Sequence, residues 1–228
     1  QNAGHFTLLA GIERVGPDPE LTGLLGPLED HLQPRCRGLA GLSVPFSPPS
    51  QVRPTTAMRA MAGDEELYIE YFQEPGRAEA EIEADIRDWL LGFMFSGSGD
   101  APPPAPSKAT MATIPSGARM KDRFSHPEAM PAWLTDADLD VYTSEFEHGG
   151  LRGPLNRYRN VDRDWEDLAA FRGARIDVPA LFIGGDRDGP TIWGTPAIAA
   201  FEQTLPKLHR SIILEGCGHW TQQERPAE

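Results

Sequence analysis

The chain has 228 residues and a formal net charge of −13, from 21 Lys and Arg against 34 Asp and Glu. An acidic chain repels phosphate backbones, so nucleic acid is not an expected partner. The longest apolar runs fall short of the roughly 18 residues of a membrane span, so no membrane contact is expected either. Two cysteines, Cys36 and Cys217, are too few for a disulfide framework or a structural zinc site. We expect a cytoplasmic globular protein without a metal or a cofactor.

Three short apolar runs predict buried strands, at residues 38–44, 178–185 and 211–216. Runs that are apolar on both faces favour a parallel sheet covered by helices. Residues 195–206, between the second and third runs, carry apolar side chains at helical spacing, so these elements form a βαβ unit. The predicted fold class is therefore α/β, with a partial core of parallel strands and flanking helices.

A helical block is predicted between the first strand and the second. Its helices share apolar side chains at helical spacing; they cover residues 77–95, 136–148 and 152–171. Thr135 followed by Asp138 resembles a capping box, which would start the middle helix. Residues 96–117 are rich in Pro, Ser and Gly and should form a loop.

These patterns divide the chain into three segments. Residues 1–46 form the N-terminal part of the α/β core and end in the strand before the insertion. Residues 47–175 form an all-helical cap. Residues 176–228 form the C-terminal part of the core. The acidic residues between positions 64 and 88 are read as a solvated helix face rather than a cation site.

Two loops after predicted strands carry candidate catalytic groups. His219 lies in GCGHW, after the third strand, and Asp186 and Asp188 lie in GGDRDG, after the second. Ligands bind at the carboxyl edge of parallel sheets, so an acid here can orient and stabilise a catalytic histidine. An Asp and a His on successive strand ends are typical of the second half of an α/β-hydrolase triad. Turn-forming Asp residues and a surface histidine are the simpler alternatives.

Two tyrosines of the insertion stand in unusual local sequences. Tyr71 lies in YFQEPG and Tyr158 in GPLNRYRN. A phenol with its ordinary pKa near 10 is a neutral donor at pH 7, so two phenols on one oxygen could clamp an ether or epoxide oxygen. Packing with the hydroxyl at the surface is the simpler alternative for each tyrosine.

Five strings together resemble soluble epoxide hydrolases of the α/β-hydrolase superfamily, in the family's order: LSVPF (42–46), YFQEPGRAEAE (71–81), GPLNRYRN (153–160), PALFIGGDRD (179–188) and GCGHWTQQERP (216–226). The resemblance implies an α/β core with an inserted helical cap. It also implies a reaction in which an Asp attacks the epoxide carbon to form an alkyl-enzyme ester, and a His oriented by an acid activates the water that cleaves this ester.

Carried over to this sequence, the resemblance makes Asp188 the orienting acid and His219 the base, with Asp186 ranked second. Tyr71 and Tyr158 become the donors to the epoxide oxygen, and we expect them to face the same cavity as His219. The apolar residues expected along the substrate site are Pro45, Phe46, Phe72 and Trp220. The expected partner is a small apolar epoxide, with a homodimer as a further option.

The sequence departs from the family at its nucleophile. It contains no small-x-Asp-x-Gly elbow and no HGxP loop; its His-Gly pair is His148-Gly149 in the insertion. We therefore expect a truncated relative that is inactive or a fragment, because losing the nucleophile removes most of the rate. One alternative is a non-catalytic cap-bearing fragment that binds apolar ligands or self-associates. Another is a relative of haloalkane or fluoroacetate dehalogenases, which the paired-tyrosine strings disfavour.

Overall fold

The computed structural model describes residues 37–103 and 113–228. They form two compact units. The first combines residues 37–51 with Asp164–Thr221, and the second combines Val52–Arg163 with Gln222–Glu228. The expectations for residues 1–36, Cys36 included, lie outside the described residues. None of the helices in the described part of the chain is long and apolar enough to cross a membrane.

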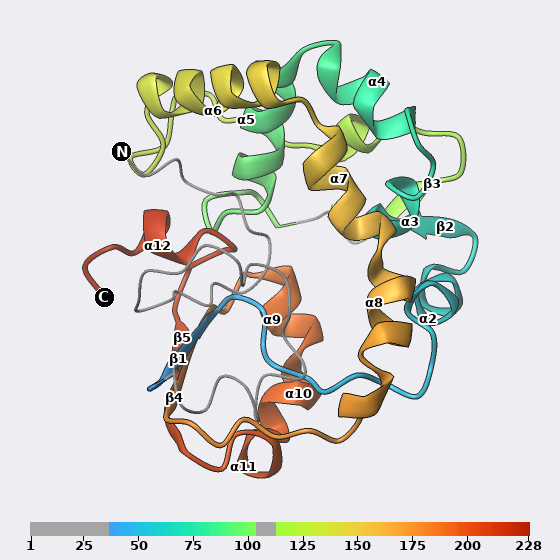
Figure 1. Cartoon of the computed structure of the whole chain (residues 1–228). Helices are drawn as coiled ribbons and strands as arrows, with labels where there is room; N and C mark the ends of the chain where they lie inside the picture. Colours follow the sequence, from blue (N-terminus) through green and yellow to red (C-terminus); the bar gives the residue numbers. More distant parts are fainter. Residues whose placement is uncertain (1–36, 104–112) are drawn as a thin grey trace. The chain divides into compact units, whose positions relative to one another are not determined.

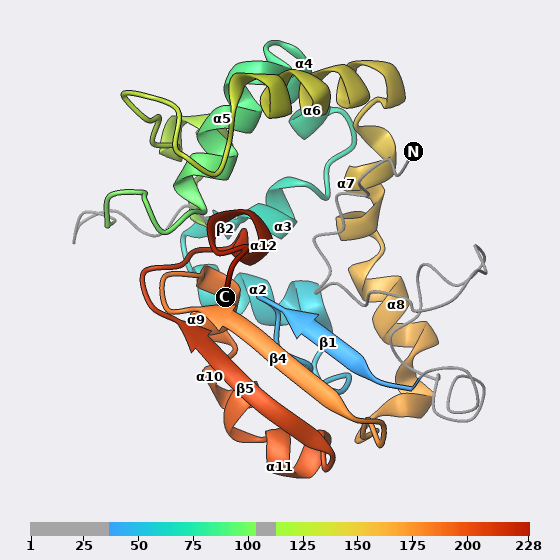
Figure 2. The same cartoon turned by 90° about the vertical axis from the view of Figure 1, so that its left-hand side faces the viewer.

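The first unit is built on a three-stranded parallel sheet (Figure 2). Its strands are β1 (Leu39–Leu42), β4 (Ala180–Gly185) and β5 (Leu208–Leu214), in the order β1-β4-β5. Both pairings are parallel, with Leu42 opposite Ile183 and Gly185 opposite Leu214. The three predicted strands and their parallel arrangement are confirmed. All three carboxyl ends therefore reach the same edge of the sheet.

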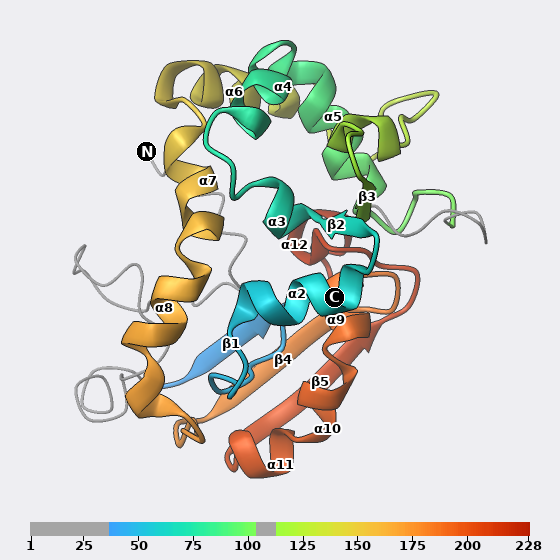
Figure 3. The same ribbon diagram turned by 90° about the vertical axis from the view of Figure 1, so that its right-hand side faces the viewer.

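Three short helices cover one face of this sheet (Figure 3): α9 (Gly189–Trp193), α10 (Thr195–Ala199) and α11 (Phe201–Thr204). The ring of Phe182 on β4 packs edge-on against Phe201 at 5.3 Å, and both side chains are buried. A fully buried phenylalanine contributes about 2 kcal/mol of transfer free energy. The single helix predicted over residues 195–206 is two helices, because Ala200 ends one and begins the next.

The second unit is mostly helical, with a short antiparallel pair of strands (Figure 1). Its elements are α2 (Pro54–Ala62), β2 (Glu65–Leu67), α3 (Tyr68–Tyr71), α4 (Arg77–Glu83), α5 (Ile86–Ser96), β3 (Thr113–Pro115), η2 (Met120–Arg123), α6 (Asp136–Gly149) and α7 (Arg152–Arg159). Two further helices, α8 (Val161–Asp167) and α12 (Thr221–Glu224), have residues in both units. The pairing of β2 with β3 was not predicted, because strands of three residues carry no periodic signal.

Two of the predicted helices are interrupted. The stretch 77–95 is α4 followed by α5, because the Asp85 side chain accepts a hydrogen bond from the backbone N–H of Asp88 at 3.0 Å and starts a new helix. The stretch 152–171 is α7, α8 and a 3-10 turn over Ala169–Phe171.

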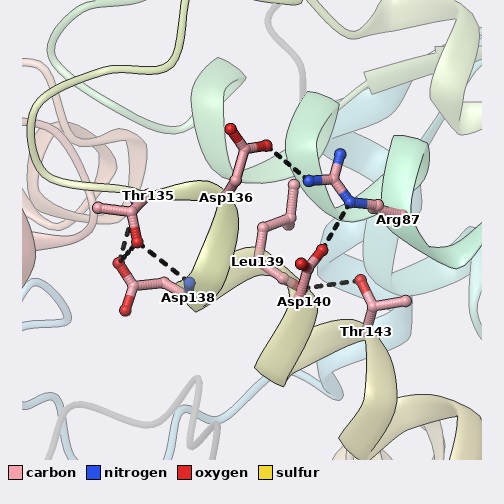
Figure 4. Close-up of polar contacts among 7 residues, drawn as sticks. All are labelled: Arg87, Thr135, Asp136, Asp138, Leu139, Asp140 and Thr143. Atoms are coloured by element: carbon pink, nitrogen blue, oxygen red, sulfur yellow. Dashed lines mark hydrogen bonds and ion pairs between the residues drawn. The ribbon is translucent and has the colours of Figure 1, made fainter.

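The start of α6 is as predicted (Figure 4). The Thr135 hydroxyl oxygen accepts from the N–H of Asp138 at 3.1 Å, and the Thr135 N–H donates to the Asp138 carboxylate at 3.0 Å. Arg87 of α5 donates to Asp136 at 2.7 Å and to Asp140 at 3.0 Å, so this exposed cation joins α5 to the first turns of α6 (Figure 4). Leu139, on the same helix, is fully buried.

Candidate active site

An acid and a base meet at the carboxyl edge of the sheet in the first unit. The Nδ1 atom of His219 lies 2.8 Å from the Oδ1 atom of Asp188. The Asp188 side chain is 0% exposed and that of His219 13%. A carboxylate that faces Nδ1 accepts its proton and leaves the Nε2 lone pair as the basic position of the ring. This is the geometry that an orienting acid and a general base require.

Glycine at position 185 lets the two loops meet. The backbone at Gly185 passes so close to the Cys217 carbonyl that an added Cβ would collide with it. The Arg187 N–H donates to that same carbonyl at 3.0 Å, and the Gly216 N–H donates to the Asp186 carboxylate at 2.7 Å. The loop after β4 is thus joined to the loop after β5, which brings Asp188 and His219 together.

The two candidate acids have different surroundings. Asp186 is exposed and bonds the Gly216 N–H, as a turn-forming Asp does. Asp188 is buried at the start of α9, where it accepts from the N–H and lies 2.7 Å from the hydroxyl of Thr191. Of the two, Asp188 is the carboxylate that contacts His219.

Three of the expected substrate-site residues belong to this unit. Trp220 is buried, with its ring edge-on to the His219 imidazole at 4.9 Å. Pro45 is buried against Gly194, where a Cβ would collide with its ring. Phe46 packs against the core cluster that contains Phe182. Trp220 is thus in direct contact with His219, whereas Phe46 contributes to the core.

In the second unit, Tyr158 of α7 is in ring contact with Tyr68 of α3. The two ring centroids are 5.7 Å apart and nearly perpendicular. The fourth expected substrate-site residue, Phe72, lies 5.0 Å from the Tyr158 ring and 5.8 Å from the Tyr68 ring. Burial, and then the neighbouring Tyr68, raise the pKa of Tyr158 well above its usual range. Tyr158 is therefore a neutral hydrogen-bond donor at neutral pH.

Tyr71 has a different environment from Tyr158. Its hydroxyl donates to Glu81 at 2.5 Å, and its side chain is buried. Burial, and then this bond to the carboxylate, raise the pKa of Tyr71 to about 12. Glu81 also accepts from the indole N–H of Trp89 at 3.0 Å and from the backbone N–H groups of Met120 and Lys121 at 3.1 and 2.9 Å. The expected role of Tyr71 as an epoxide donor stays a prediction.

Three residues that contact the candidate site residues were not identified from the sequence. Tyr68 contacts Tyr158, Thr191 contacts Asp188, and Glu81 contacts Tyr71. Tyr68 stands three positions before Tyr71 in the same short helix, so the doubled tyrosine in YIEYFQ was an available signal. Thr191 follows Asp188 at the spacing of a helix cap. Glu81 had no distinguishing signal among the acids around it. In residues 37–103 and 113–228, no group of three or more His, Cys, Asp or Glu side chains is placed to hold a metal ion.

A parallel sheet that carries a buried Asp and a His on successive strand ends defines an α/β-hydrolase core. The comparisons with known proteins narrow this class. No protein-family model matches the chain. Epoxide hydrolase B of Mycobacterium tuberculosis is 40% identical in an alignment 223 positions long, and this alignment covers 85% of this chain and 63% of that protein. Epoxide hydrolase A of the same species is 41% identical over 194 residues, 85% of this chain and 59% of that protein.

Solved structures similar to this chain are also epoxide hydrolases. An epoxide hydrolase from an endophytic Streptomyces is 55% identical with a TM-score of 0.80, over 83% of this chain and 57% of that one. Epoxide hydrolase A from Mycobacterium thermoresistibile is 42% identical with a TM-score of 0.76, over 86% and 60% of the two chains. The chain is therefore similar to part of the epoxide hydrolases of the α/β-hydrolase superfamily. It spans about three fifths of the length of these relatives, and the comparisons give no support to the dehalogenase alternative.

Proposed function

We propose that this chain carries the water-activating pair and the epoxide-binding tyrosines of an epoxide hydrolase, and that its ligand is a small apolar epoxide. The observation that carries the proposal is the 2.8 Å contact between Asp188, which is fully buried, and His219. Burying a carboxylate costs free energy unless the carboxylate is paired with a positive charge or accepts hydrogen bonds. Here it accepts from His219 and Thr191, as an acid that stabilises an imidazolium should.

In the second half of the family reaction, for which an alkyl-enzyme ester must be supplied, His219 would act through Nε2. The nitrogen takes a proton from a water molecule as the water oxygen adds to the carbonyl carbon of an alkyl ester, and the imidazolium formed is stabilised by Asp188. When the ester C–O bond breaks, the alkoxide leaves as the second hydroxyl of a vicinal diol and takes that proton. The ring of Trp220, edge-on to the imidazole, excludes water from one side of the base.

The epoxide oxygen would be held by phenol hydroxyls. Contact between the rings of Tyr68 and Tyr158 supports this pair as the donors. Tyr71 is the other candidate partner of Tyr158, although its hydroxyl already donates to Glu81. Because burial raises the pKa of Tyr158, its proton stays available as a donor over the whole neutral range.

The 228 residues contain no Asp on a Gly-flanked elbow, so the first half of the family reaction has no nucleophile in this sequence. Groups that act as a unit lose most of their effect when one is absent. We infer that this chain binds epoxides without forming the alkyl-enzyme ester. A non-catalytic role is thus part of the proposal rather than a rival to it.

Styrene oxide tests the proposal. Calorimetric titration should give saturable binding, chromatography should find no diol above the uncatalysed rate, and mass spectrometry should find no protein adduct. The absence of saturable binding would overturn the ligand assignment. Multiple turnovers would show that another group replaces the missing nucleophile. Sedimentation of the same sample would test the homodimer that the sequence leaves as an option.

A further inference from the structure

Ser43 has a backbone conformation that residues with a Cβ rarely adopt. It directly follows β1, its φ is 64°, and it is the one non-glycine with positive φ in the described part of the chain. Its N–H donates to the Ile183 carbonyl on β4 at 2.8 Å, and its side chain is only 4% exposed. A glycine would adopt this conformation without strain, so the serine side chain needs a separate explanation.

The Ser43 hydroxyl binds the backbone of the catalytic loop. It donates to the carbonyl oxygen of His219 at 2.7 Å, across 176 positions of sequence. The Ser43 carbonyl in turn lies 2.8 Å from the Thr191 hydroxyl, which is also 2.7 Å from the Asp188 carboxylate. Since a hydroxyl has one proton, Thr191 shares it between these two acceptors.

These contacts hold His219 at two points. Asp188, from the loop after β4, fixes the imidazole through Nδ1. Ser43, from the end of β1, fixes the main chain of the same residue. A base must be held within a fraction of an ångström to transfer a proton efficiently. Strained residues that persist at such sites are held there by the surrounding structure.

The geometry points to Ser43 as a positioning residue for His219, with Thr191 linking it to the orienting acid. The inference rests on the proposed function, because it assigns Ser43 to the Asp–His pair of that proposal. It does not require the chain to turn over an epoxide. The readout is the low-field proton resonance of His219 Nδ1–H in its hydrogen bond to Asp188.

Three variants test the inference by proton NMR: Ser43→Gly, Ser43→Ala and Asp188→Asn. Ser43→Gly relieves the strain and removes the hydroxyl, whereas Ser43→Ala keeps the strain and removes the hydroxyl. Both should speed exchange of the Nδ1 proton with water about fivefold to tenfold, the effect of losing one hydrogen bond. Ser43→Gly should do so without lowering the urea midpoint of unfolding. Ser47→Gly, at an exposed serine nearby, is the matched control and should change neither quantity.

The outcomes separate this inference from the function on which it rests. If Ser43→Gly leaves the exchange rate at its wild-type value, the hydroxyl has no positioning role and the inference fails. Should Ser43→Ala not fold, the glycine variant alone decides the question. If the wild-type protein lacks a low-field resonance that Asp188→Asn removes, the Asp–His pair of the proposed function fails instead.

Discussion

Arg159 of α7 binds both carboxylate oxygens of Glu79 on α4, at 2.8 Å each. The same guanidinium donates to the Phe72 carbonyl at 2.8 Å, and the Gln73 side-chain amide donates to the Tyr158 carbonyl at 2.8 Å. The helix that carries Tyr158 is therefore fastened to the segment that follows Tyr68 and Tyr71. A bidentate pair with side chains 12% and 16% exposed is stronger than a surface ion pair.

Replacing Glu79 should loosen this attachment. Glu79→Gln leaves the Arg159 guanidinium with a neutral partner, and we expect the free energy of unfolding to fall by about 2 kcal/mol, the range of hydrogen bonds to charged groups. Urea denaturation measures the loss. Arg87→Gln, which removes the exposed ion pairs of Figure 4, is the control and should leave the midpoint near its wild-type value. Equal losses in the two variants would contradict the special role of the Glu79 pair.

The lowered pKa of Glu79 predicts that the free energy of unfolding decreases at acid pH. Hydrogen bonding to Arg159 lowers the pKa of Glu79 from 4.5 to about 2. A depressed folded-state pKa contributes stability that is fully present above the unfolded value and is lost as the pH falls from 4.5 toward 2. Unfolding midpoints measured from pH 6 to pH 3 should therefore fall more steeply for the wild-type protein than for Glu79→Gln. If the unfolding midpoints of the two proteins fall equally with pH, other carboxylates cause the loss of stability in acid.

The identity of the epoxide donors can be decided by three matched substitutions. If Tyr68 and Tyr158 hold the oxygen, then Tyr68→Phe and Tyr158→Phe should each weaken styrene oxide binding about fivefold to tenfold, the effect of one lost hydrogen bond. Tyr71→Phe should lower stability instead, because it removes one donor from Glu81. Tyr142→Phe on α6 serves as the control. Weaker binding in Tyr71→Phe with no effect of Tyr68→Phe would favour the pairing expected from the sequence.

The sequence was informative where a signal is local or where topology leaves little choice. The three strands were predictable from short apolar runs, and the start of α6 from Thr135 and Asp138. Asp188 and His219 were expected to be neighbours because the carboxyl ends of adjacent parallel strands share one edge. The interruption at Asp85 was missed, because apolar side chains continue at helical spacing through it.

Contacts of individual side chains were not predictable where neither a local pattern nor the strand order indicates them. Tyr68 and Tyr71 look alike in YIEYFQ, and nothing in the sequence shows that Glu81 accepts a hydrogen bond from the Tyr71 hydroxyl. The bond from Ser43 to the His219 carbonyl joins positions 176 residues apart and is not visible in any local pattern. Such contacts are decided by packing, which one sequence alone does not report.

The close approach of the loops after β4 and β5 can be tested by substituting Gly185. Gly185→Ala places a methyl group against the Cys217 carbonyl, so the loops after β4 and β5 must separate. We expect the low-field resonance of the His219–Asp188 hydrogen bond to broaden or vanish. Gly63→Ala is a suitable control for a glycine substitution, because its added Cβ would meet no atom within 4 Å, although its φ of 62° makes it mildly strained. An unchanged resonance in Gly185→Ala would contradict the close approach.

The charge of Glu81 is expected to contribute to the raised pKa of Tyr71. The pKa of Tyr71 is raised to about 12 first by burial and then by the hydrogen bond to Glu81, whose negative charge opposes a phenolate. Glu81→Gln keeps an acceptor but removes the charge, so the pKa of Tyr71 should fall part of the way toward 10. A raised folded-state pKa stabilises the protein below pH 10, and this stability is lost as the pH rises through 12.

Ultraviolet absorbance of the phenolate, followed from pH 9 to pH 12.5, measures this change. The chain has four tyrosines, so Tyr71→Phe identifies the step that belongs to Tyr71. The wild-type curve should show a late step near pH 12 that moves to lower pH in Glu81→Gln and is absent in Tyr71→Phe. A late step that Glu81→Gln does not move would mean that burial alone raises the pKa, and the charge of Glu81 would then have no part in keeping Tyr71 protonated.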